Sequence, residues 1–159
     1  MAEIRQYVNI LVESLEKKKK VLQALQEENK KQEKAMKENS DLEEFDRIVS
    51  YKEKLIREIQ VLDGGFEKLY ERIKDDLLAE KKQYASEIKK MQSLIEDVTE
   101  LSVAIQASEQ RNKQLVEQYF SYTRGKIRQA KKSVKVASEY YKSMNRMNYV
   151  DSALLDKKK

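Results

Sequence analysis

Apolar residues recur at the start of the chain in alternating steps of three and four. They are Ile4, Val8, Leu11, Leu15, Leu22, Leu25 and Met36. This spacing places them on one face of a helix. Polar residues occupy the missing steps of the same pattern at Lys18, Asn29 and Gln32. The pattern therefore predicts a first helix over about residues 3–38.

A second helix is predicted over about residues 41–80. The sequence Ser40-Asp41-Leu42-Glu43 matches a capping box, in which the Ser40 hydroxyl accepts from the Glu43 amide. Leu42, Val49 and Ile56 widen the apolar face over the first half of this helix. A wide face indicates two neighbouring helices. The seam itself consists of Phe45, Ile48, Lys52, Leu55, Ile59, Leu62, Phe66, Leu69 and Ile73.

Gly64-Gly65 does not interrupt this second helix, because the apolar spacing keeps its phase across the two glycines. The pattern lapses instead between Ala79 and Ala85. A third helix is predicted from about residue 84, and its apolar positions continue as far as Tyr141. They include Ile88, Met91, Ile95, Val98, Ile105, Val116, Tyr119, Ile127 and Val134.

Short connections make successive helices antiparallel, so we expect the first and third helices to lie against the second. The predicted fold is an all-α antiparallel three-helix bundle or coiled coil formed by residues 1–124. Because the second helix has about forty residues, support for the third should end near residue 124. Residues 125–159 are predicted to form a basic overhanging helix and a flexible tail that bind a partner. Folding back over the bundle end, or fraying, remains an alternative for this segment.

Charge divides the chain in the same way. Residues 1–110 carry 20 Lys+Arg against 24 Asp+Glu, and residues 111–159 carry 13 against 4. The two parts therefore have net charges of −4 and +9. The chain has no cysteine, no apolar run long enough to span a bilayer, and no secretion signal in MAEIRQYVNI. We expect a cytoplasmic protein without stable membrane insertion.

The residue inventory argues against catalysis. There is no histidine and no cysteine, which excludes nucleophilic dyads, thiolate zinc sites and the His-containing di-iron sites of helical bundles. Adjacent carboxylates such as Asp75 and Asp76 point about 100° apart on a helix and cannot converge on one bond. We predict no catalytic residue, no metal site and no cofactor.

Nucleic-acid binding is the alternative from another functional class, since cations interleave with tyrosines after Tyr119. The cations are Arg124, Lys126, Arg128, Lys131, Lys132 and Lys135. They spread around a helix instead of forming one stripe, and the Lys17–Lys20 run is explained by three lysines facing water and Lys18 extending its head to the surface. We therefore predict no nucleic-acid partner.

Three stretches of the chain resemble the FlgN family of flagellar type III export chaperones. LEKKKKVLQALQEENKKQEKAMKENSDLEEFDRIVSYKEKLIREIQVLD resembles the family's first hairpin. SLIEDVTELSVAIQASEQRNKQLVEQ resembles the start of its last long helix, and VDSALLDKKK resembles the tails of Gram-positive members. The resemblance extends over essentially the whole chain.

The resemblance implies a chaperone, and not an enzyme, that binds the C-terminal helical segments of the hook-filament junction (hook-associated) proteins. It would prevent their premature assembly and deliver them to the export gate. The client surface implied by the family lies on the second half of the last helix. Here that region contains Leu115, Val116, Tyr119, Tyr122, Ile127, Val134 and Ala137.

Docking to the cytoplasmic domain of the export gate is implied for a tyrosine beyond this helix, matched here by Tyr140 and Tyr141. The glycine that commonly follows in the family is missing. A monomer or weak homodimer is expected. A generic coiled-coil adaptor or scaffold, which would be a stable oligomer, remains the main alternative function.

Overall fold

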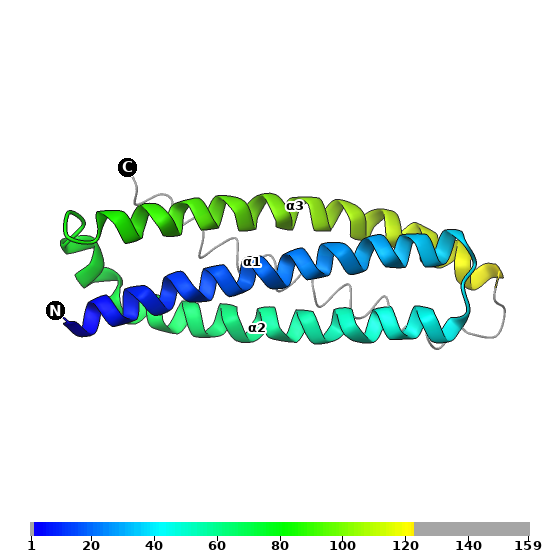
Figure 1. Ribbon diagram of the computed structural model, residues 1–159, viewed down its shortest axis with the longest axis horizontal. Coiled ribbons are helices and arrows are strands. Elements are labelled where there is room, and N and C mark those ends of the chain that lie inside the picture. The colour runs from blue at the N-terminus through cyan, green and yellow to red at the C-terminus, as the bar shows by residue number, and fades with distance from the viewer. Residues whose placement is uncertain (1, 123–159) are drawn as a thin grey trace.

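Three long helices form the described part of the protein. The computed structural model describes residues 2–122, with α1 at Ala2–Lys37, α2 at Leu42–Ala79 and α3 at Ala85–Tyr122. Successive helices run antiparallel, so α1 and α3 point the same way, and because the three lengths are nearly equal the helices lie side by side along the whole bundle (Figure 1). The predicted all-α three-helix bundle is confirmed. The predicted overhang at residues 125–159 lies outside the described residues.

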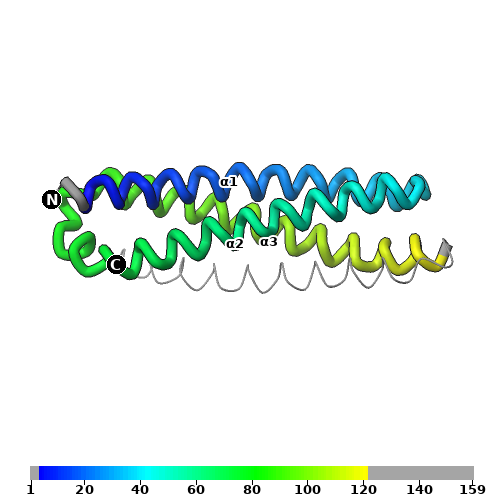
Figure 2. The backbone as a smooth tube through the Cα atoms, turned by 90° about the horizontal axis from the view of Figure 1, so that it is seen from below, coloured from blue at the N-terminus to red at the C-terminus, as the bar shows by residue number. Residues whose placement is uncertain are grey.

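The central helix is α1, and the prediction that α2 would hold this position is wrong. α1 packs against both other helices, whereas no Cα atom of α2 lies within 8 Å of one in α3 over their described lengths. Figure 1 shows α1 between its neighbours, and Figure 2 shows it along one edge with α2 and α3 on its other side. Only side chains bridge the wider gap between α2 and α3.

The width of the buried face of α1 agrees with its central place. At several levels two consecutive residues are buried, such as Leu11 with Val12 and Ala35 with Met36. Consecutive positions on a helix point about 100° apart, so such pairs serve two neighbours. The wide apolar face of α2 is covered by α1 and by side chains from α3. Short connections fix antiparallel order but do not decide which helix is central.

The connection between α1 and α2 is closed by two local motifs. Asn39 has a positive φ of 51°, and the Ser40 amide donates to the Ala35 carbonyl at 2.8 Å. Asparagine is one of the few residues other than glycine that tolerate this conformation after a helix. Asp41 then caps α2, because its carboxylate accepts from the Glu44 amide at 2.8 Å. The cap therefore lies one residue later than the predicted Ser40–Glu43 box.

The second helix continues through Gly64-Gly65, as predicted, and ends at Ala79. Each glycine in a helix interior costs roughly 1 kcal/mol relative to alanine. A turn region follows, in which Tyr84 is fully buried and its carbonyl accepts from the Ile88 amide at 2.9 Å. The predicted break between residues 79 and 85 is confirmed.

A buried group of polar side chains crosses the bundle between two apolar clusters. Lys52 of α2 contacts Glu109 of α3 at 2.6 Å and donates to Gln32 of α1 at 2.7 Å. The Lys52 and Glu109 side chains are only 7% and 6% exposed. We call this group, together with Asn29, Ser108 and Asn112, the polar layer. It joins α2 to α3 where their backbones stand apart.

The rest of the polar layer comes from Asn29, Ser108 and Asn112. The Asn29 side-chain amide donates to the Ser108 hydroxyl at 2.8 Å, and Asn112 donates to the Asn29 carbonyl at 3.1 Å. Buried polar groups are costly unless paired, so these contacts favour one alignment of the three helices.

Lys18 forms a second ion pair, between α1 and α2, with Asp63, whose side chain is partly exposed. The Lys18 side chain is almost fully covered, and so the prediction that its head would extend to the surface is wrong. Asp63 supplies the countercharge that the sequence pattern of α1 alone could not reveal.

Asp41→Ala should lower the free energy of unfolding by about 1 kcal/mol, because the Glu44 amide loses its acceptor. Ser40→Ala is the control, because the backbone carbonyl by which Ser40 accepts from the Tyr119 hydroxyl is also present in alanine. Urea unfolding monitored by circular dichroism measures both. A larger loss of unfolding free energy for Ser40→Ala than for Asp41→Ala would show that Ser40 caps the helix, as the Ser40–Glu43 capping box predicts.

Lys52→Met should lower the free energy of unfolding by about 3–5 kcal/mol, because Glu109 is left as a buried charge without its partner. The double variant Lys52→Met/Glu109→Leu should recover most of this loss. Arg57→Met, which breaks a surface pair with Glu53, should cost under about 1 kcal/mol. If the double variant lost as much free energy of unfolding as Lys52→Met and Glu109→Leu lose together, Lys52 and Glu109 would not interact energetically.

Candidate functional site

The end of the bundle at which α3 finishes carries its own apolar cluster, here called the loop-end cluster. It lies beside the α1–α2 connection and is separated from the other apolar clusters by the polar layer. Its buried members are Met36, Phe45, Val49, Val116 and Tyr119, and Leu42, Leu115 and Phe120 pack against it partly buried.

Three aromatic rings form the centre of the loop-end cluster. Phe45 of α2 stacks on Tyr119 of α3 with 5.1 Å between ring centroids, and Phe120 meets both rings edge-on at 5.3 and 5.4 Å. Offset-stacked and edge-to-face pairs are the favoured aromatic geometries. These rings fasten the last turns of α3 to the start of α2.

The Tyr119 hydroxyl also closes the α1–α2 connection. It donates to the Ser40 carbonyl at 2.6 Å. Burial, reinforced by the carboxylates of Asp41 and Asp46, raises the pKa of Tyr119 above its ordinary value of 10.0. The phenol therefore remains protonated and keeps donating throughout the neutral range. Because the folded-state pKa is raised, this contribution to stability is present below about pH 10 and is lost only as the pH rises through the folded-state value.

The structure describes three of the seven predicted client-binding residues in full. Val116 and Tyr119 are 6% and 2% exposed, and Leu115 is partly buried, so all three belong to the loop-end cluster. Tyr122 is the last residue of α3, and its side chain lies outside the described part. The other predicted residues lie wholly outside it, namely Ile127, Val134 and Ala137 for the client and Tyr140 and Tyr141 for the gate.

Phe45 and Phe120 are part of the same cluster but were not among the predicted site residues. Phe45 was assigned only to the apolar seam of the second helix, although its ring is the main contact for Tyr119. Phe120 follows Tyr119 directly and takes the adjoining face of α3. The sequence could have indicated Phe120 as a site residue, because it directly follows Tyr119. The contact between Phe45 and Tyr119 depends instead on how the helices pack.

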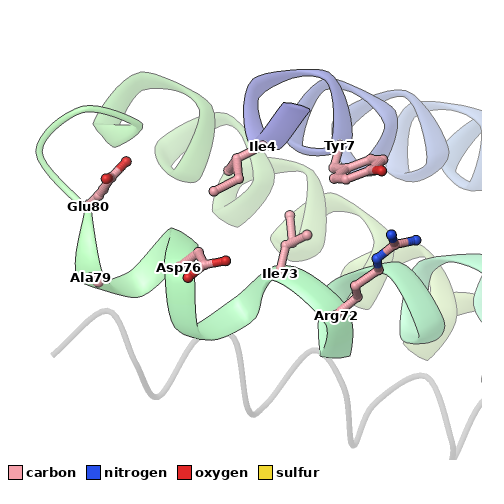
Figure 3. Close-up of a pocket in the computed structure, with 7 residues that line it drawn as sticks. All are labelled: Ile4, Tyr7, Arg72, Ile73, Asp76, Ala79 and Glu80. Carbon is pink, nitrogen blue, oxygen red and sulfur yellow. The ribbon is translucent and has the colours of Figure 1, made fainter. Parts of the chain in front are cut away.

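A hollow of about 330 Å³ lies at the opposite end, between the first turns of α1 and the last turns of α2. Figure 3 shows its lining side chains, with Ile4 and Tyr7 from α1 facing Ile73, Asp76 and Arg72 from α2. The Arg72 guanidinium lies 5.3 Å from the centre of the Tyr7 ring, a cation–π distance. The described lining combines apolar side chains with the charged side chains of Arg72, Asp76 and Glu80.

Residues 2–122 also lack two features that a functional site could use. No group of three or more acidic side chains gathers there in a way that could hold a metal ion. None of the three helices is long and apolar enough to cross a membrane.

Comparison with known proteins assigns the chain to a family. The model of the FlgN family, described as "FlgN protein", matches residues 1–148. No curated protein and no solved structure matches the chain. The match covers the whole three-helix bundle and continues past the end of α3 at Tyr122. The chain therefore belongs to the FlgN family, whose general role is that of a flagellar export chaperone.

Proposed function

We propose that this chain is a cytoplasmic chaperone of flagellar type III export. It binds the C-terminal helical segments of the hook-filament junction proteins, keeps them unassembled and delivers them to the export gate. The observation that carries the proposal is the family match over residues 1–148, which includes both the bundle and much of the basic segment after it.

Burial in the loop-end cluster divides the predicted client-binding residues into two roles. Val116 and Tyr119 face the interior of the bundle, where they anchor the end of α3. A client helix can reach them only if that end of α3 separates from Phe45. We therefore assign direct client contact to Ile127, Val134 and Ala137, with partly buried Leu115 at the border of the site.

The chemistry needed for this role is modest. Helical segments that associate with each other need only a substitute apolar stripe to remain apart, and no nucleotide or metal enters that exchange. The net charge of +9 over residues 111–159 attracts acidic segments of a client or of the gate. Such attraction speeds encounter more than it tightens binding.

Val134→Asp should abolish the complex with a junction protein while leaving the melting temperature of the chain nearly unchanged, because a charge enters the proposed stripe. Ser133→Asp is the matched control, since it adds the same charge at a position about 100° away on a helix. The full-length chain is mixed with each junction protein from the same genome. Complex mass is then measured by size exclusion with light scattering.

The expected result is a stable complex for the wild type and Ser133→Asp and none for Val134→Asp. Unaltered affinity of Val134→Asp would remove the proposed client site. A wild-type chain that binds neither junction protein and forms a large homo-oligomer would replace the chaperone proposal with the scaffold alternative.

Replacing Tyr140 and Tyr141 by alanine together should weaken binding to the cytoplasmic domain of the export gate and spare the client complex. Tyr51→Ala is the control, because Tyr51 is a tyrosine exposed on α2. Binding of each client-loaded variant to the isolated gate domain is measured by biolayer interferometry. Equal loss of client and gate binding would assign the two tyrosines to the client surface instead.

A further inference from the structure

Two hollows follow each other in the furrow between α1 and α2, and none of their described lining residues belongs to α3. One, of about 220 Å³, lies around Ile10 and Gly65. The other is the hollow of about 330 Å³ at the end of α2 that Tyr7 helps to line. One stripe of α2 borders both hollows in steps of four, three and four, and it consists of Gly65, Leu69, Arg72 and Asp76. We call this surface the outer furrow.

The outer furrow exposes apolar surface beside Gly65. Ile10 and Val61 are 49% and 75% exposed, and Leu62 and Leu69 lie partly buried at the edges of the hollow. Gly65 has no positive φ, and a Cβ atom there would meet nothing within 4 Å, so the bundle itself does not require glycine at this position. Glycine lets another backbone approach closely. This part of the furrow therefore suits a helix laid against it, as in helix-in-groove recognition.

Cations outnumber carboxylates on the outer faces of α1 and α2 around Gly65. The cations are Lys17, Lys54, Lys68 and Arg72, and the carboxylates are Glu13 and Glu58. Lys17 and Lys68 are exposed, and neither forms an ion pair within residues 2–122. Hydrogen bonds between ammonium and carboxylate groups are stronger than those between neutral groups. Acidic side chains on the flanks of an incoming helix therefore find partners here.

The charge of the outer furrow changes sign at the end of α2. Asp76 and Glu80 line the second hollow, whereas Arg72, the cation of its described lining, is turned onto an aromatic ring of α1. The Glu80 Oε2 atom is buried and accepts no hydrogen bond from the described part of the chain, which is unfavourable for a carboxylate. Ile4 and Ile73 supply apolar walls (Figure 3). An arginine or lysine from outside can lay its stem along these walls and bring its charge to the two carboxylates.

We propose that the outer furrow binds an amphipathic helix of another protein. Acidic residues of that helix flank its contact with Gly65, and an arginine or lysine at its end reaches Asp76 and Glu80. Gly65 and Glu80 are fifteen residues apart, or about 22 Å along a helix, so roughly four turns of the partner cover both hollows. The contact area of one such helix is small, and the complex is therefore weak.

Charge argues against two other occupants of the outer furrow. A second copy of the chain would bring its own surplus of cations to the cations around Gly65. Residues 123–159 carry 11 Lys+Arg against 3 Asp+Glu, so they too are repelled from the longer, cationic part of the furrow.

A synthetic helix of about twenty residues, roughly 30 Å long, is the probe for the full-length chain. It has leucines in steps of three and four, glutamates between them and two arginines in its last turn. A tryptophan replaces the leucine expected over Gly65, and because the chain has no tryptophan, the emission reports the probe alone. We expect a shift of this emission to shorter wavelength on binding. A second probe with lysine in place of each glutamate should bind at least tenfold more weakly.

Gly65→Gln tests the contact with the glycine, and Gly64→Gln is its matched control. Both variants place a good helix former in open space, so both should raise the melting temperature, but only position 65 lines the hollow. Gly65→Gln should weaken binding of the probe at least tenfold. Lys68→Glu should weaken it about fivefold, whereas Lys89→Glu, the same change at an exposed position of α3, should not. Attraction of the probe to the basic residues after Tyr122 is the same in all these variants and cannot produce the differences.

The acidic hollow is tested by Asp76→Asn combined with Glu80→Gln. This double variant should bind the probe about tenfold more weakly than the wild type does, because the arginines lose their carboxylates. It should bind a probe with glutamine in place of both arginines as well as the wild type does.

Three results would each overturn the proposal. They are a wild type that leaves the tryptophan emission unchanged up to several hundred micromolar, equal affinity for the lysine probe, and an affinity that Gly65→Gln does not reduce. The complex with a junction protein should persist in Gly65→Gln, so failure of this proposal and failure of the chaperone role are separate outcomes.

Discussion

The position of α1 between α2, which runs antiparallel to it, and α3, which runs parallel to it, is the constraint on which the other features depend. α1 buries adjacent residues at several levels, so one side of its wide face serves α2 and the other serves α3. The backbones of α2 and α3 are then held too far apart for close helix packing. Long side chains such as Lys52 and Tyr119 span the gap between the two backbones. This explains why an ion pair and stacked aromatic rings link α2 to α3.

Much of this bundle could be predicted from the spacing of apolar residues. The spacing gave the number of helices, the break before Ala85 and the continuity through Gly64-Gly65, because these depend on residues close together in the sequence. The predicted N-cap of α2 was wrong by one residue. Ser40 and Asp41 are both residue types that cap helices well, and the structure, with Asn39 at a positive φ, places Asp41 at the cap. Local patterns leave such choices to the geometry of the turn.

What could not be predicted depends on contacts between distant segments. Lys18 and Lys52 stood at core positions of their helices, but their partners Asp63 and Glu109 belong to other helices and follow from packing alone. The same reason applies to the site. The spacing of α3 placed Val116 and Tyr119 on one stripe, yet only the packing shows that this stripe is turned toward Phe45. The remaining predicted site residues lie beyond Tyr122, outside the described part.

The uneven placement of the polar layer along the helices has a mechanical consequence. A seam of leucines alone would let one helix slide past another by a heptad at little cost in energy. Here such axial slip would separate Asn29 from Ser108 and Gln32 from Lys52, and it would leave several buried polar groups unpaired. The three helices are thereby locked at one height relative to each other. Whatever follows Tyr122 starts from a fixed point beside the α1–α2 connection.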